Sequence, residues 1–189
     1  MSRYYTDSFI SMTQLAHSNK YGSENMFQTE LQELVNEISA KVFTFQKTGY
    51  SFEEWFNWEL YNKLINHGYD AQPKPPMQSD LKSFADILVN KPFDDRDVYI
   101  EVKLVHDDTG DKWLGEIEKD HLALKSNTEN TSAIGFQILL LTSSHKNLIQ
   151  HPNWKPWLNR LTFWSVQPDT LVHSNQENGN TVIVGWVIN

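Results

Sequence analysis

The spacing of apolar residues along the chain predicts three amphipathic helices. Apolar side chains recur every three or four positions over residues 24–45, 51–67 and 113–125, the period that gathers them on one face of a helix. Ser51, followed three residues later by Glu54, has the pattern of a capping box at the start of the second helix. Three helices of this kind need other elements to cover their apolar faces.

Other stretches have the composition of β-strands. Residues 84–89 and 98–105 are rich in β-branched and aromatic residues, and the polar segment between them predicts a hairpin. Residues 133–142 form a continuous apolar run, which is typical of a strand buried on both faces. Two further strands are predicted at residues 160–166 and 181–188. The order of elements favours an α/β fold in which a mixed central β-sheet is flanked by helices.

The composition is that of one globular domain. The chain has 189 residues, of which 39% are hydrophobic, enough for one substantial core, and no linker or internal repeat divides it. It contains no cysteine and therefore neither disulfides nor thiolate zinc sites. Because it has no run of about 18 apolar residues and no signal-peptide pattern, we expect a cytoplasmic protein that does not partner a membrane.

One predicted strand carries two opposite charges that its apolar character does not explain. In residues 98–105, Glu101 and Lys103 are two positions apart and therefore point to the same face of the strand. Burying these two charges in a sheet costs free energy unless they form an ion pair or bind a ligand. Asp86 lies in the neighbouring predicted strand. Two acids and a lysine on adjacent strands are suited to Mg²⁺-dependent cleavage of a phosphodiester, whereas an ordinary surface ion pair of Glu101 and Lys103 is the alternative.

The order of these residues resembles that of a known superfamily of nucleases. Ala85-Asp86 and Glu101-Val102-Lys103, with 14 residues between the two acids, resemble the motif of the PD-(D/E)XK superfamily, which has the restriction-endonuclease-like fold. Alanine replaces the proline of the motif, but the carboxylate performs the chemistry. The resemblance covers about residues 49–142.

The preceding helix adds to the resemblance. This helix resembles the pattern of Mrr-type restriction enzymes, lengthened by about one helical turn. The residues that carry the resemblance are Gly49 to Glu53, then Leu60 and Leu64, then Gly68-Tyr69. Within a single domain of residues 1–189, this implies an N-terminal helical extension (1–48), a catalytic core (49–142) and C-terminal strands (143–189).

The resemblance also implies roles for individual residues. Asp86 and Glu101 would hold Mg²⁺, for which Mn²⁺ could substitute, with the Val102 carbonyl as a further ligand. Lys103 would orient or deprotonate the attacking water and stabilise the transition state. A helix glutamate is expected to join them. At 100° per residue, Glu53 lies on the flank of Leu60 and Leu64, so it is preferred over Glu54, which stays possible.

Weaker expectations concern three other residues. Gln137, inside the apolar run, either faces the site or is a buried amide with its hydrogen bonds made. Lys119 and Lys125, on the helix after the motif, are candidates for contacts with nucleic acid.

The function expected from these features is that of a metal-dependent endonuclease acting on DNA, such as a type II restriction enzyme or a related defence or repair nuclease. Cutting both strands of a duplex would require a homodimer. The net charge of −8 and the presence of only three arginines argue against a strongly basic DNA reader. They favour the alternative of a catalytically silent, nuclease-like binding subunit or inhibitor.

Overall fold

The computed structural model describes most of the chain, namely residues 23–46, 48, 50–93, 95–106, 109–143, 158–176 and 179–189. Within this part, six strands form one mixed sheet in the order β1-β2-β3-β4-β6-β5. Their bounds are β1 Ala71–Pro73, β2 Ile87–Phe93, β3 Arg96–Val105, β4 Ile134–Ser143, β5 Thr170–Gln176 and β6 Gly179–Ile188. β3 and β4 are parallel, and all other neighbouring strands are antiparallel.

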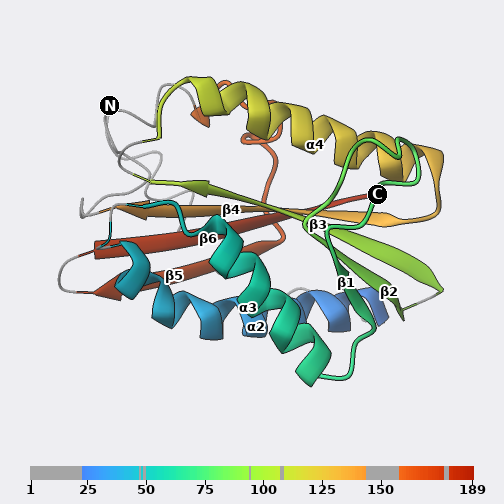
Figure 1. The fold of residues 1–189 in the computed structure, drawn as a ribbon, viewed down its shortest axis with the longest axis horizontal. Coiled ribbons are helices and arrows are strands. Elements are labelled where there is room, and N and C mark those ends of the chain that lie inside the picture. The colour runs from blue at the N-terminus through green and yellow to red at the C-terminus, as the bar shows by residue number, and fades with distance from the viewer. Residues whose placement is uncertain are drawn as a thin grey trace.

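Three helices cover the two faces of the sheet. α2 (Ser23–Gln46) and α3 (Glu53–Asn66) lie on one face, and α4 (Lys112–Asn130) crosses the other as the connection from β3 to β4 (Figure 1). A parallel pair of strands needs such a crossover, because a tight turn can join only antiparallel strands. The predicted α/β fold with a mixed sheet between helices is therefore confirmed.

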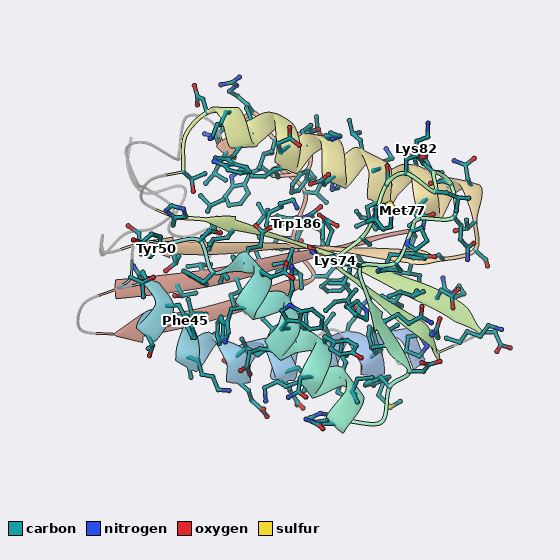
Figure 2. All side chains as sticks on the ribbon, in the orientation of Figure 1. Phe45, Tyr50, Lys74, Met77, Lys82 and Trp186 are labelled. Carbon is teal, nitrogen blue, oxygen red and sulfur yellow. The ribbon has the colours of Figure 1, made fainter. Side chains whose placement is uncertain are left out.

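The apolar stripes of α2 and α3 form the larger core. In α2 the stripe runs from Phe27 to Val42 at intervals of three and four residues, and every member is almost fully buried. Phe56, Leu60 and Leu64 continue it on α3 and pack with the even-numbered side chains of β3. Figure 2 shows Phe45 in this helical layer.

The opposite face of the sheet forms a second core beneath α4. Leu114 and Ile117 of α4 pack there against odd-numbered residues of β3 and β4, together with Phe163 and Trp186 (Figure 2). All ten residues of β4 are buried, as the continuous apolar run predicts for a central strand.

Most predicted elements are confirmed, but the capping box is wrong. α3 begins at Glu53 with Phe52 as its N-cap residue, and Phe52 makes no side-chain capping hydrogen bond. The Phe52 side chain is instead buried against Phe45 and Trp55. Apolar packing thus sets the start of the helix.

No helix in the described part of the chain is long and apolar enough to cross a membrane.

The strand predicted at residues 160–166 is also wrong. This segment forms consecutive turns, in which Leu161, Trp164 and Val166 each donate a backbone hydrogen bond to the carbonyl three residues earlier. Leu158, Leu161 and Phe163, in and just before this segment, pack in the second core. The strand that comes before β6 in the chain is instead β5, at Thr170–Gln176, and it pairs with β6.

The predicted hairpin is present with shifted limits. β2 begins at Ile87, three residues later than predicted, and Phe84 makes only an isolated bridge to Pro76. β2 then continues to Phe93 and β3 begins at Arg96, so the connection is shorter than the polar segment suggests. Asp86 therefore lies just before β2, beside the part of β3 that extends past its pairing with β2.

Candidate active site

The candidate site lies where β3 extends past the beginning of β2. The strand pairing reaches Ile100, and the following residues of β3 have no strand on that side within the described chain. Asp86 Oδ2 accepts a hydrogen bond of 2.8 Å from the Val102 N–H. Glu53 Oε2 accepts one of 2.7 Å from the Leu104 N–H. Because the N–H and C=O of a strand residue point to the same side, the Val102 carbonyl also faces this edge, between the two carboxylates.

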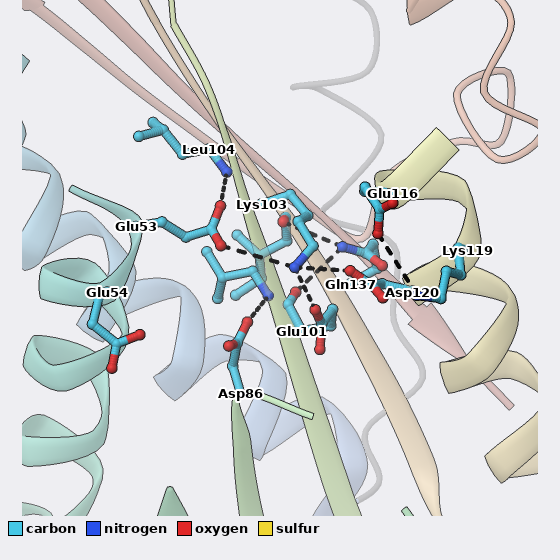
Figure 3. Close-up of polar contacts among 12 residues, drawn as sticks. Glu53, Glu54, Asp86, Glu101, Lys103, Leu104, Glu116, Lys119, Asp120 and Gln137 are labelled. Atoms are coloured by element: carbon cyan, nitrogen blue, oxygen red, sulfur yellow. Dashed lines mark hydrogen bonds and ion pairs between the residues drawn. The ribbon is translucent and has the colours of Figure 1, made fainter. Parts of the chain in front are cut away.

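Lys103 lies on the α4 face of β3, among three carboxylates (Figure 3). Its Nζ is 2.7 Å from Glu101 Oε1, 3.0 Å from Asp120 Oδ2 and 3.8 Å from Glu53 Oε1. The side chains of Lys103 and Glu101 are only 16% and 4% exposed. An ordinary surface ion pair on a half-exposed sheet is therefore excluded for these two residues.

The charged side chains around Asp86, Glu101, Lys103 and Glu53 form a cluster. Two further residues belong to this cluster but not to the sequence motif. Asp120 of α4 contacts Lys103, and Lys74 Nζ lies 2.5 Å from Asp86 Oδ1. Helical periodicity could have found Asp120, since it follows the buried Ile117 by three residues and so borders the apolar stripe. No sequence signal identifies Lys74, which reaches Asp86 from the loop after β1.

Burial dominates the pKa values of Glu101 and Glu53 in the cluster. Burial and the nearby charge of Asp86 raise the pKa of Glu101 to about 8, although the Lys103 ammonium acts in the opposite direction. Burial likewise raises the pKa of Glu53 against the effects of Lys103 and the Leu104 N–H.

Lys103 keeps its proton in this environment. Burial alone would favour the neutral amine, but Glu101, Glu53 and Asp120 outweigh it and raise the pKa of Lys103. The cluster thus combines the Lys103 ammonium with a Glu101 carboxyl group whose pKa is raised by burial.

One oxygen of the cluster makes no hydrogen bond to a described residue. This atom, Glu101 Oε2, is buried, and leaving a buried carboxyl oxygen without a partner is costly. Mg²⁺ prefers carboxylate and carbonyl oxygens, so Asp86, Glu101 and the Val102 carbonyl fit such a cation in their chemistry. As the side chains lie, no group of three acidic or histidine side chains in the described chain is gathered closely enough to hold an ion. Lys74 and Lys103 supply the balancing charge instead.

A cleft of about 440 Å³ opens beside the cluster, between the N-terminal parts of α3 and α4. Eight residues line it: Glu53, Lys103, Leu104, Lys112, Trp113, Glu116, Ile117 and Asp120. Of the cluster, Glu53, Lys103 and Asp120 therefore face the cleft, whereas Asp86 and Glu101 lie outside its lining. A molecule bound in the cleft would touch the ammonium of Lys103.

Glu54 and Gln137, the two residues named as possible members of the site, lie in different surroundings. Glu54 is exposed, and its carboxylate lies 3.4 Å from Lys74 Nζ, away from Lys103 (Figure 3). Gln137 is fully buried on β4, directly opposite Glu101. Its Nε2 donates a long hydrogen bond of 3.4 Å to the Glu101 carbonyl, and its Oε1 has no partner among the described residues. Gln137 thus contacts β3 at Glu101, and Glu54 contacts Lys74, which in turn contacts Asp86.

The two lysines expected to contact nucleic acid lie on the surface of α4 and outside the cleft lining. Lys119 is 3.7 Å from Glu116 and Lys125 is 3.8 Å from Glu129, each one helical turn away.

Comparisons with protein-family models, curated proteins and solved structures gave no match to this chain.

Proposed function

We propose that this chain is a Mg²⁺- or Mn²⁺-dependent endonuclease of DNA with a restriction-endonuclease-like core. The observation that supports the proposal most is the edge of β3, where Asp86 and Glu53 flank Val102 and where Glu101 and Lys103 belong to the same strand segment. Hydrolysis of a phosphodiester needs anionic ligands for a hard cation and a fixed positive charge for the transition state. The cluster offers both.

The proposed ligands are Asp86, Glu101 and the Val102 carbonyl, with Glu53 as a further acid. A bound Mg²⁺ would lower the pKa of a water molecule and neutralise charge on the phosphate. The orphan oxygen of Glu101 supports this assignment, since cation binding would give it a partner.

Lys103 is proposed to bind the phosphate electrostatically. Since its pKa is raised by the surrounding carboxylates, it cannot act as a general base near neutral pH, but it can donate hydrogen bonds to a phosphate oxygen. Asp120 would position Lys103 from α4, because its carboxylate lies 3.0 Å from Nζ. Of the roles that the resemblance implies for Lys103, orienting the attacking water and stabilising the transition state are favoured over deprotonating the water.

The second candidate is a silent, nuclease-like binding protein. The contact between Lys74 and Asp86 supports it, because an ammonium at 2.5 Å takes up an oxygen that a cation would need. The net charge of −8 also suits a protein partner better than a polyanion.

Cleavage assays separate the two candidates. Plasmid DNA and labelled DNA and RNA oligonucleotides would be incubated with the wild type, Asp86→Asn or Lys103→Met, in Mg²⁺, in Mn²⁺ and in EDTA. We expect metal-dependent cleavage, reduced about 100-fold or more in both variants. Glu59→Gln is the matched control, since Glu59 lies on the same helix as Glu53 but pairs with Lys41.

Three outcomes decide the matter. Full activity in both variants, or activity in EDTA, would contradict the assigned site. If no substrate is cut in either metal, and circular dichroism shows that all the proteins are folded, the binding protein is favoured.

A further inference from the structure

The first turn of α4 carries an aromatic ring and a cation into the cleft beside Lys103. Trp113 lines the cleft and is 47% exposed, although it is among the largest apolar side chains of the protein. The Nζ atom of Lys112 lies 5.0 Å from the centroid of the Trp113 ring. The same cleft reaches Lys103 and Glu53, so a ligand stacked on Trp113 would adjoin the proposed catalytic groups.

We propose that this cleft binds one unpaired nucleotide, with its base stacked on Trp113 and its phosphate near Lys112. The inference rests on the proposed nuclease function and names its substrate as single-stranded DNA or a frayed duplex end. A base inside a duplex is covered on both faces by its neighbours and cannot stack on a protein ring, whereas an unpaired base can. The cleft volume of about 440 Å³ lies in the range of small-ligand sites.

The charges of the described residues agree with this substrate. Lys112 forms no salt bridge with a described carboxylate, in contrast to Lys119 and Lys125. Among the lysines of α4, Lys112 is therefore the one whose ammonium contacts a ring and no described carboxylate, so its charge is available to a phosphate beside the ring. Three acids, Glu53, Glu116 and Asp120, share the cleft, so charge alone gives little affinity for DNA. Stacking on the ring must then supply a large part of the binding free energy.

Trp58 offers a matched control for Trp113. It is 49% exposed, lies on α3 and packs edge-on against Tyr61, outside the cleft lining. An effect common to the loss of any exposed tryptophan would appear in both variants, and an effect of the cleft only in Trp113→Ala.

The test compares binding and cleavage of three labelled oligonucleotides of one sequence: a single strand, a blunt duplex and a forked duplex. Binding is measured by fluorescence anisotropy in EDTA, so that no strand is cut. We expect the wild type to prefer the single strand and the fork over the blunt duplex at least about 10-fold. Trp113→Ala should weaken binding of the single strand about 5- to 150-fold, the loss expected for one base–aromatic stack, while Trp58→Ala stays within about twofold of the wild type.

The outcomes distinguish this inference from the nuclease proposal. Equal binding and cleavage of duplex and single strand, or equal behaviour of Trp113→Ala and Trp58→Ala, would overturn the cleft assignment and leave metal-dependent cleavage standing. Loss of single-strand binding in Trp113→Ala supports the cleft even where no oligonucleotide is cut in Mg²⁺, and in that case the nuclease proposal fails alone.

Discussion

Lys103 shows how much of the site a single residue organises. Its ammonium joins Glu101 of its own strand, Glu53 of α3 and Asp120 of α4, which are far apart in the sequence. Substituting a neutral residue would remove the cation that Glu53, Glu101 and Asp120 share, and acidic groups left close together without it destabilise the fold. For this reason the activity of Lys103→Met has to be read beside its stability.

Glu101 predicts how the stability of the metal-free protein depends on pH. Its pKa is about 8 in the folded protein and near the ordinary value of 4.5 in the unfolded chain, so between these values the folded state holds one more proton. The contribution of Glu101 to the free energy of unfolding is fully present below about pH 4.5 and falls as the pH rises to about 8. The slope is at most about 1.4 kcal/mol per pH unit.

Glu101→Gln isolates this effect, because glutamine mimics the protonated carboxyl at every pH. Urea unfolding in EDTA at several values between about pH 5 and 8 should show a flatter decline for the variant. The advantage of the variant over the wild type should grow toward pH 8. Parallel pH profiles of the two proteins would contradict the raised pKa of Glu101.

At the scale of elements, Gly135 sets how closely α4 approaches β4. A Cβ atom at Gly135 would lie 2.8 Å from Leu124 Cγ and 3.2 Å from Ile188 Cβ. Leu124 is completely buried and cannot withdraw without disturbing its neighbours. Gly135→Ala should therefore lower the free energy of unfolding by about 1–3 kcal/mol, as overpacking does in other cores.

Gly115→Ala is the control for this prediction. Gly115 lies within α4, and an added Cβ would meet nothing within 4 Å. Since alanine favours a helix interior over glycine, this change should raise the free energy of unfolding by about 0.5–1 kcal/mol. Urea unfolding of both variants measures the two values. Equal effects of the same sign would show that Gly135 does not control the packing of α4.

The sequence predicts best the elements whose burial follows a simple period. The helices, β3, β4 and β6 were predictable because their apolar stripes or runs match the face that they bury. β1 has only three residues and depends on its pairing with β2, and the exposed Gln72 and Pro73 leave no pattern. β5, with the sequence Thr-Leu-Val-His-Ser-Asn-Gln, is half polar and is defined by its pairing with β6.

The same limit applies to the site. Strand alternation places Glu101 and Lys103 on one face, and helical geometry turns Glu53 toward the sheet, so these positions follow from local periods. The contacts of Lys74 and Asp120 depend on how a loop and α4 fold back onto β3. Helical periodicity places Asp120 beside the apolar stripe of α4, but no local pattern identifies Lys103 as its partner or brings Lys74 to Asp86.

At the scale of the whole molecule, charge limits how nucleic acid can bind. The protein carries a net charge of −8, and many of its described lysines pair with carboxylates, such as Lys41 with Glu59 and Lys63 with Glu37. A protein whose lysines are neutralised by its own carboxylates releases few counterions when it binds DNA. Few phosphate contacts are therefore expected, and those in the cleft should account for most of them.

Salt dependence of single-strand binding measures this number. With Lys112 and Lys103 as the contacts, a plot of log K against log salt should have a slope of about −1 to −2, because each phosphate contributes about −0.7 for single strands. Lys112→Gln should reduce the magnitude of the slope by about 0.7, and Lys125→Gln, on the same helix but outside the cleft, should leave it unchanged. A slope of about −4 or steeper, or one that Lys112→Gln does not alter, would mean that DNA binds across another surface. Because the slope counts ionic contacts while Trp113→Ala reports stacking, the two measurements together separate the electrostatic from the aromatic part of the affinity.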